Sequence, residues 1–471
     1  MNNSNNTIAK NTIIYALGDI IPKALNLVTF PILTSYLSTG DYGIVNYVQS
    51  IILFLTIVTF LCLKTFYLVY YFKVGDEIAQ KKLLGNLTII VTVLNVVATI
   101  LFLLVGQVFF KFIGSGVDFY PYILYGVLIN FFGIFSQLPS ALYRVRENPM
   151  PLTILNVLRG LLIMVCTICF VTVYPSVKTV LIIQLLITFL FSIFFIWITC
   201  KNAIFEFNWK QTKQALAFSL PLVPGDVAYY FSTMSDRILI EKYLAVSDLG
   251  LYSTASTIAG LLNIISYGAY RAIEPYFFKQ YGKSGFKHEF ERIRDILLMC
   301  IMGCGIGLCL FSKEFLCFFS SEGYHSAYIY VSPLVLVVVM NSLGYLYGTI
   351  MTAQSKTKRN GMISVTCASV SVSFNILLLP IIGVWSAVLA SICVSFIGYS
   401  LLKWQSRYYV GFYRPLFALI IAVLFCYFLV YQLNIESISV SICIKVILYV
   451  IVVVVLMSIY KVKFSDIKKM L

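Results

Sequence analysis

Three positively charged residues, Lys23, Lys64 and Arg271, lie within long apolar stretches of the sequence. If these stretches cross a membrane, each buried charge costs at least about 2.5 to 3.5 kcal/mol, so it needs a partner, water or a function. Lysine and arginine bind anions, and the planar guanidinium group of arginine grips phosphate with paired hydrogen bonds. These residues therefore predict a hydrated, cation-lined cavity for an anionic substrate.

Acidic residues lie close to two of the three cations. Asp19 precedes Lys23 by four residues and Glu274 follows Arg271 by three, spacings that allow an ion pair along one face of a helix. Lys64 has no acidic residue within one helical turn in the sequence, so we expect it to face water or an anion. Carboxylates at this depth are also candidates for binding a coupling ion, Na⁺ or H⁺, and these candidates are Asp19, Asp226 and Glu274.

Other features beside the cations have two interpretations. Tyrosines cluster next to Lys64 and Arg271, where their hydroxyl groups and ring faces suit sugars, although tyrosine also marks membrane interfaces. The candidates for sugar contacts are Tyr67, Tyr70, Tyr267 and Tyr270. Charges nearer the ends of the apolar stretches are assigned to structure, because long side chains reach the interface; these are Asp236, Arg237, Glu241 and Lys445.

The sequence lacks the residues that common catalytic and metal sites need. The two histidines, His288 and His325, fall in predicted connections, and nearly all of the 12 cysteines lie in apolar stretches, where they behave as small hydrophobic residues. No Gly-rich phosphate loop is present. We therefore expect no catalytic residue, no metal site and no cofactor.

The composition identifies the elements that must position these residues. Of 471 residues 60% are hydrophobic and 11% are charged, whereas a soluble domain is about 25% charged. Because the polar residues 1–10 lead into an apolar stretch too long for a signal peptide, we expect the first helix to be retained. The fold class is therefore an all-α integral membrane protein with about 14 transmembrane helices.

Apolar stretches and polar breaks place these helices along the chain. They are expected at 11–38, 42–72, 84–106, 119–143, 152–174, 177–200, 214–243, 248–278, 293–320, 326–352, 361–381, 383–404, 412–434 and 438–460. Prolines are expected to break the first and seventh of them, at Pro22, Pro31, Pro221 and Pro224.

Positive charges alternate between the connections. Most of the 34 Lys and Arg residues fall on one side, whereas the alternate connections hold only Lys111, Lys178, Lys242 and Lys313. Because cytoplasmic loops are enriched in Lys and Arg, both termini are predicted to be cytoplasmic, in the inner membrane of a bacterial cell. The net charge of +15 follows from this bias and from attraction to the lipid bilayer, so no nucleic acid partner is expected.

A weak internal repeat relates residues about 207 apart. Asp19 corresponds to Asp226, Asp41 to Asp248, and Lys64 to Arg271. The offset spans six predicted helices, so both copies have the same orientation, and transporters with such parallel repeats bind substrate between two lobes. The predicted domains are an N-terminal lobe at 1–205, a C-terminal lobe at 206–408, and two additional helices with a short basic cytoplasmic tail at 409–471.

Several short motifs resemble those of the Wzx-type polysaccharide flippases (O-antigen or capsule repeat-unit flippases) of the multidrug/oligosaccharidyl-lipid/polysaccharide exporter superfamily. They are Pro31-Ile-Leu-Thr-Ser-Tyr-Leu with Asp41-Tyr-Gly43, Ser235-Asp-Arg237-Ile-Leu-Ile with Leu249-Gly-Leu-Tyr252, and Ala353-Gln-Ser-Lys356-Thr-Lys358. The resemblance implies alternating access and export of an undecaprenyl-diphosphate-linked oligosaccharide, with a polysaccharide polymerase as a further partner. In the related lipid II flippase, cationic residues of helices one, two and eight line the cavity, and Lys23, Lys64 and Arg271 occupy those helices here.

Two other functions remain as alternatives. A cation-coupled multidrug exporter of the same superfamily is expected to line its cavity with acids, a role open to Asp19 and Asp226. A membrane enzyme of polysaccharide assembly is expected to have a long external loop, and the predicted external connections are short. The sequence therefore favours a transporter over an enzyme.

Overall fold

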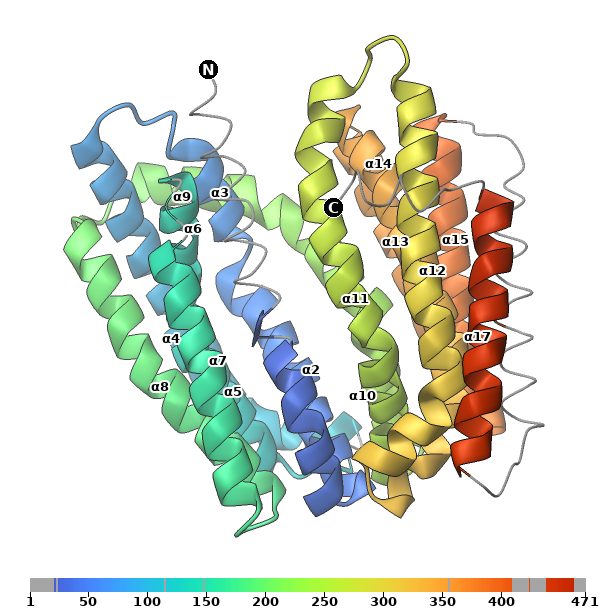
Figure 1. The fold of residues 1–471 in the computed structure, drawn as a ribbon. Coiled ribbons are helices and arrows are strands. Elements are labelled where there is room, and N and C mark those ends of the chain that lie inside the picture. The colour runs from blue at the N-terminus through green and yellow to red at the C-terminus, as the bar shows by residue number, and fades with distance from the viewer. Residues whose placement is uncertain are drawn as a thin grey trace. The chain divides into compact units, whose positions relative to one another are not determined.

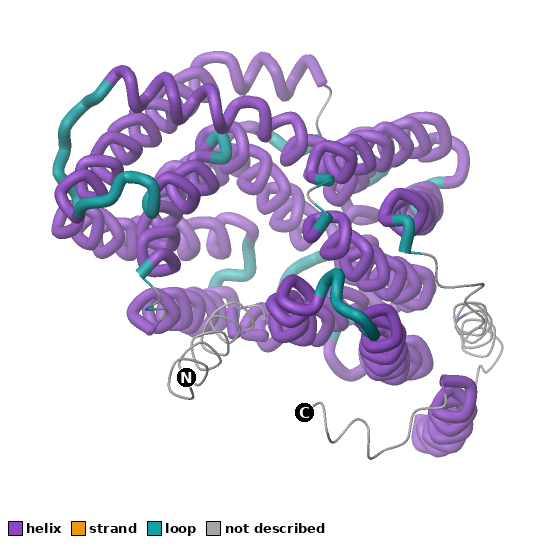
Figure 2. The backbone as a smooth tube through the Cα atoms, turned by 90° about the horizontal axis from the view of Figure 1, so that it is seen from above, coloured by secondary structure: helices purple, strands orange, loops and turns teal. Residues whose placement is uncertain are grey.

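The structure, a computed structural model, describes residues 21–22, 24–113, 116–146, 148, 150–354, 356–408, 423 and 438–460. Within these residues the chain forms helices and connecting loops (Figures 1 and 2). Ten of the described helices are long and apolar enough to cross a membrane, and two shorter apolar helices lie at Ala24–Tyr36 and Ser441–Leu456. The predicted all-α integral membrane fold is therefore confirmed.

The chain divides into two compact units, Met1–Leu249 and Gly250–Leu471. These limits differ from the predicted lobes 1–205, 206–408 and 409–471, which stay a prediction about the repeat. The helices of unit 1 are α2 (Thr39–Phe60), α3 (Leu63–Tyr70), α4 (Glu77–Ile113), α5 (Leu124–Gly133), α6 (Gln137–Val145), α7 (Met150–Val171), α8 (Val177–Asn202), α9 (Trp209–Ser219) and α10 (Val223–Tyr243).

Unit 2 contains most of the remaining helices. The helix α11 (Val246–Gln280) begins at the end of unit 1, and it is followed by α12 (Phe286–Phe319), α13 (Tyr328–Ala353), α14 (Thr357–Ile382), α15 (Trp385–Ser406) and α17 (Ile438–Tyr460). Figure 1 shows α12, α13, α15 and α17 running alongside one another. The helix predicted at 412–434 lies outside the described residues, apart from residue 423.

Most predicted helices match these bounds, with several differences. The helix α12 begins at Phe286, several residues before the predicted start at 293, because its first turns carry polar residues that resemble a loop in sequence. The seventh predicted helix is interrupted at Leu220–Leu222, as its prolines predict. The prediction of a break at Pro31 is wrong, since the first helix continues through that residue from 24 to 36.

The second predicted helix is divided at Leu61 and Cys62. Both residues adopt left-handed backbone conformations, with φ of 46° and 58°, so α2 ends and α3 starts after them. Non-glycine residues adopt this conformation at a steric cost of about 1 to 2 kcal/mol each. The break changes the direction in which α3 presents its side chains, including Lys64.

Polar side chains fix the ends and the packing of the helices in unit 1. Ser38 and Asp41 form a reciprocal capping box at the start of α2, which gives a structural role to the aspartate of the Asp41-Tyr-Gly43 motif. The hydroxyl group of Tyr230 on α10 donates to the backbone carbonyl of Ser50 on α2 at 3.0 Å. The hydrogen bond of Tyr230 holds α10 against α2.

One glycine permits a close backbone approach in unit 1. A Cβ atom at Gly85 on α4 would collide with the backbone carbonyl oxygen of Ile204 and lie 2.6 Å from its carbonyl carbon. The amide of Ile204 also donates to the carbonyl of Lys81 at 3.0 Å, so the loop after α8 is held against α4.

We expect Gly85→Ala to destabilise the protein by about 1 to 3 kcal/mol, because backbone atoms cannot move aside as a flexible side chain can. Thermal unfolding of purified protein in detergent measures this as a lower Tm. The control is Gly348→Ala in α13, where a Cβ meets nothing within 4 Å and better helix propensity should leave Tm unchanged or raised. An unchanged Tm for Gly85→Ala would contradict the close approach.

Candidate functional site

Lys64 lies in the first turn of α3, directly after the break in the second predicted helix. The side chain is half-buried, and its Nζ atom donates to the hydroxyl group of Ser140 on α6 at 3.4 Å. This hydrogen bond joins the start of α3 to α6. The helix break and α6 together position this cation.

The same break positions an acidic residue of α10. The Cys62 thiol donates to Oδ2 of Asp226 at 3.1 Å, and Asp226 is exposed in the first turn of α10. Cys62, expected to behave as a small hydrophobic residue, therefore makes a polar contact. An exposed carboxylate can bind a cation or a proton, but whether Asp226 is a coupling site stays a prediction.

The two tyrosines beside Lys64 have different environments. The ring of Tyr67 is 0% exposed and packs in the core formed by α3, α4 and α6, so a sugar can reach it only after repacking. Tyr70 stacks on Phe66 with ring centroids 4.1 Å apart, and its hydroxyl group accepts a hydrogen bond from Gln214 at 3.3 Å. Tyr70 is the more accessible of the two for a polar ligand.

In unit 2, Tyr267 and Tyr270 lie on α11 and both contact Tyr345 of α13. The hydroxyl groups of Tyr267 and Tyr345 are 2.6 Å apart, and the rings of Tyr270 and Tyr345 are 5.4 Å apart. The backbone of α11 continues through Arg271 and Glu274, whose side chains lie outside the description, as do Asp19 and Lys23 entirely. The predicted grouping of Lys23, Lys64 and Arg271 therefore stays a prediction.

A buried ion pair in unit 2 was missed by the sequence analysis. Lys445 of α17 is 1% exposed and its Nζ atom lies 2.6 Å and 2.8 Å from the carboxylate oxygens of Glu314 on α12. The expectation that Lys445 reaches the interface as a snorkelling side chain is therefore wrong. Comparing the depths of charges in neighbouring antiparallel helices would have revealed the pair, because both residues lie toward the external ends of their predicted helices.

Other charged residues have structural contacts. Glu241 of α10 is 3% exposed and accepts the backbone amide of Val117 at 2.8 Å, in agreement with the structural role predicted for it. Arg294 of α12 is buried and pairs with Asp295 at 2.8 Å.

The basic segment at 353–358 fastens the loop between α13 and α14 to the end of α15. The side chains of Gln354 and Lys356 donate to the backbone carbonyls of Ser406 and Gln405, at 2.8 Å and 3.2 Å. Desolvation lowers the pKa of Lys356, and the positive charges of Arg359 and Arg407 lower it further. A cation at the C-terminus of a helix is favourable, so this motif has a structural role at least.

Comparison with known proteins places these features in context. Residues 8–280 match the family model described as polysaccharide biosynthesis protein, and residues 221–377 match the MatE model. The chain is 22% identical over 279 residues to Lsg locus protein 1 of Haemophilus influenzae. That match covers 58% of this chain and 66% of the relative, so the chain spans slightly less than two thirds of the relative's length.

Two solved structures share the fold over most of the chain. The lipid II flippase MurJ in an inward closed conformation has a TM-score of 0.76 at 14% identity, covering 95% of this chain and 98% of that one. An inward-facing multidrug resistance MATE family transporter of the MOP superfamily has a TM-score of 0.66 at 15% identity, covering 83% and 98%. At these identities the likeness concerns the fold.

Proposed function

Because the chain belongs to the polysaccharide biosynthesis protein family, within the multidrug/oligosaccharidyl-lipid/polysaccharide exporter superfamily, we propose that it is a flippase for a lipid-linked oligosaccharide. The substrate proposed is an undecaprenyl-diphosphate-linked oligosaccharide, which moves from the cytoplasmic to the outer leaflet. Lys23, Lys64 and Arg271 are proposed to bind its diphosphate.

The observation that supports an anionic substrate is the position of Lys64. Its side chain lies half-buried next to a helix break, and its ammonium group donates a hydrogen bond to the hydroxyl group of Ser140 on α6. Transporters commonly bind substrate beside interrupted helices, where the backbone is free to adapt. A lysine ammonium group in such a place suits a phosphate group.

In an alternating-access cycle the contact between α2 and α10 must change. The ring of Phe54 on α2 packs on Tyr230 of α10 at a centroid distance of 5.3 Å, next to the hydrogen bond from Tyr230 to Ser50. The helices α2 and α10 belong to different predicted lobes. We therefore expect this contact to be formed in one state of the cycle and broken in the other. The proposed movement would separate these two helices.

A multidrug exporter is the second candidate function. The MatE match at 221–377 and the exposed carboxylate of Asp226 favour it, because an acidic residue can attract cationic drugs or couple their export to Na⁺ or H⁺. The opposite charges of Lys64 and Asp226 make the two candidates separable by substrate charge.

Flipping in proteoliposomes tests the proposal directly. The purified protein should move a fluorescent undecaprenyl-diphosphate-linked oligosaccharide between leaflets, and a cationic dye should not be transported across the same vesicles. In cells, loss of the protein should deplete surface polysaccharide and accumulate the lipid-linked precursor at the cytoplasmic face. Transport of the dye with no flipping of the lipid-linked sugar would favour the multidrug exporter.

The proposed location is a bacterial inner membrane with both termini in the cytoplasm, which predicts a definite topology. Reporter fusions should report the cytoplasm when placed after Lys82, Lys213, Lys287 and Lys356. They should report the exterior when placed after Val177, Ser247, Ser321 and Glu436. A single exchange between the two sets would contradict the predicted number of spans.

A further inference from the structure

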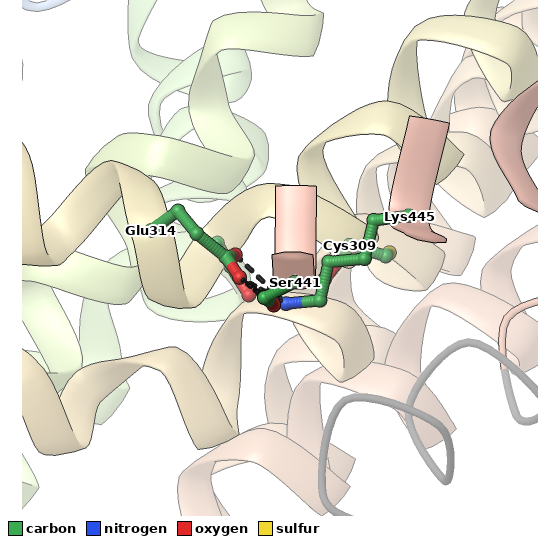
Figure 3. A network of polar contacts seen from close by, with 5 residues as sticks. Cys309, Glu314, Ser441 and Lys445 are labelled. Carbon is green, nitrogen blue, oxygen red and sulfur yellow. Dashed lines mark hydrogen bonds and ion pairs between the residues drawn. The ribbon is translucent and has the colours of Figure 1, made fainter. Parts of the chain in front are cut away.

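The buried ion pair of unit 2 joins the last described helix to α12. The Lys445 ammonium group contacts both carboxylate oxygens of Glu314, and the hydroxyl group of Ser441, one turn earlier on α17, donates to Oε1 of Glu314 at 2.7 Å. Figure 3 shows the side chains from the two helices converging on this carboxylate. Lys445, Ser441 and Glu314 are at most 9% exposed, so the network is closed to solvent.

A second contact between α12 and α17 lies further along both helices. A Cβ atom at Gly307 of α12 would lie 3.4 Å from Cε2 of Tyr449, which follows Lys445 by one turn. The aromatic ring therefore packs over a residue without a side chain. The network and this ring contact together define one register for two antiparallel helices.

The rest of α17 does not specify a register. Of the 23 residues at 438–460, 15 are Ile, Val or Leu and Lys445 is the only charged one, and large apolar side chains such as Ile447, Val450 and Val454 are exposed. Among the described helices α17 packs chiefly against α12. An apolar helix of this kind could dock on α12 in several rotations with similar burial.

The energetics of buried ion pairs favour a role in specificity. Desolvation of two charges offsets much of their attraction, and apolar replacements of similar volume often leave stability unchanged or improved. Adhesion between two apolar helices therefore does not require the pair. A misrotated α17, however, would leave Glu314 and Lys445 buried without each other, which is strongly destabilising.

We propose that Glu314, Ser441 and Lys445 are positioning residues that set the rotation and depth of α17 on α12. This inference rests on the proposed function in one respect: the lipid part of the proposed substrate stays within the membrane, where a correctly rotated α17 presents a defined apolar surface. The positioning itself is independent of substrate. No transporter cycle is needed to measure it.

Cysteine crosslinking measures the register. In a background without the native cysteines, a short bismaleimide should link Gly307→Cys to Tyr449→Cys at least about tenfold more than to Val450→Cys, which lies a rotation of 100° away. The double variant Glu314→Leu/Lys445→Leu should still accumulate in the membrane and lose most of this preference. The exchanged pair Glu314→Lys/Lys445→Glu should restore it, because the attraction is restored with the charges reversed.

The control is Lys313→Leu, which removes the charge next to Glu314 on α12. The Nζ atom of Lys313 lies 6.0 Å from the ring centroid of Tyr328. Its crosslinking preference should equal that of the parent. The single variants Glu314→Leu and Lys445→Leu leave one buried charge and are expected to accumulate poorly, so the inference does not depend on them. An unchanged preference in Glu314→Leu/Lys445→Leu would overturn the proposal.

A transport measurement separates positioning from general damage. With undecaprenyl-linked and short-chain-linked versions of the same diphosphate sugar, the Glu314→Leu/Lys445→Leu variant should lose flipping of the long-chain substrate several-fold more than of the short one. Equal loss for both would contradict the role of α17 toward the lipid part. If the parent flips neither substrate, the proposed function fails, while the crosslinking result still decides the register.

Discussion

Lys64→Ala is expected to lower flipping of the lipid-linked substrate by about 10- to 100-fold, because a charge-assisted hydrogen bond contributes about 1.5 to 3 kcal/mol. Lys64→Glu should be lower still, since a carboxylate repels a diphosphate. Lys64→Arg should keep most activity, because the requirement is a positive charge at this position. The measurement is the initial flipping rate in proteoliposomes, normalised to the amount of protein inserted.

Two further variants distinguish substrate binding from packing. Lys64 donates to Ser140, so a structural role predicts that Ser140→Ala is as harmful as Lys64→Ala, whereas substrate binding predicts a much smaller loss. Lys82→Ala is the matched control, because Lys82 pairs with Glu206 at 2.7 Å on the exposed end of α4. Full flipping by Lys64→Ala at normal abundance would remove Lys64 from the substrate site.

The helices were predictable because long apolar stretches have few alternatives in a membrane. The predicted helix at 177–200 is found as α8, Val177–Asn202, and the predicted helix at 438–460 as α17. The division of the second helix was not predictable, because helix breaks are usually marked by Gly or Pro and the sequence around Leu61 and Cys62 has neither. Tertiary packing, which the sequence does not display, must stabilise the left-handed conformation there.

In the candidate site, the charged residues could be predicted from the sequence but their partners could not. A lysine in an apolar stretch is visible in sequence, so Lys64 was found, but its contact with Ser140 joins residues 76 apart. The pairing of Lys445 with Glu314 spans 131 residues, and a search for acids within one helical turn could not detect it. Partners of buried charges therefore have to be sought between helices at the same depth.

The second large effect is expected at Arg271, which corresponds to Lys64 in the predicted internal repeat and lies on α11. Arg271→Ala should reduce flipping by about 10- to 100-fold if the guanidinium group binds the diphosphate. Arg271→Lys should retain part of the activity, because it keeps the charge and loses the paired hydrogen bonds of the guanidinium group. The measurement is again the flipping rate per inserted protein.

If Arg271 only neutralises Glu274, the double variant Arg271→Ala/Glu274→Ala should behave differently from Arg271→Ala. Glu274 follows Arg271 by three residues on α11, so the arginine could serve only to neutralise this carboxylate. In that case Arg271→Ala leaves the negative charge of Glu274 without its partner, and adding Glu274→Ala should restore flipping toward the parent rate. If Arg271 binds the substrate, the double variant lacks the same positive charge and should flip as slowly as Arg271→Ala alone. Recovery in the double variant, with both proteins inserted at equal amounts, would assign Arg271 to the ion pair and leave Lys23 and Lys64 as the proposed diphosphate ligands.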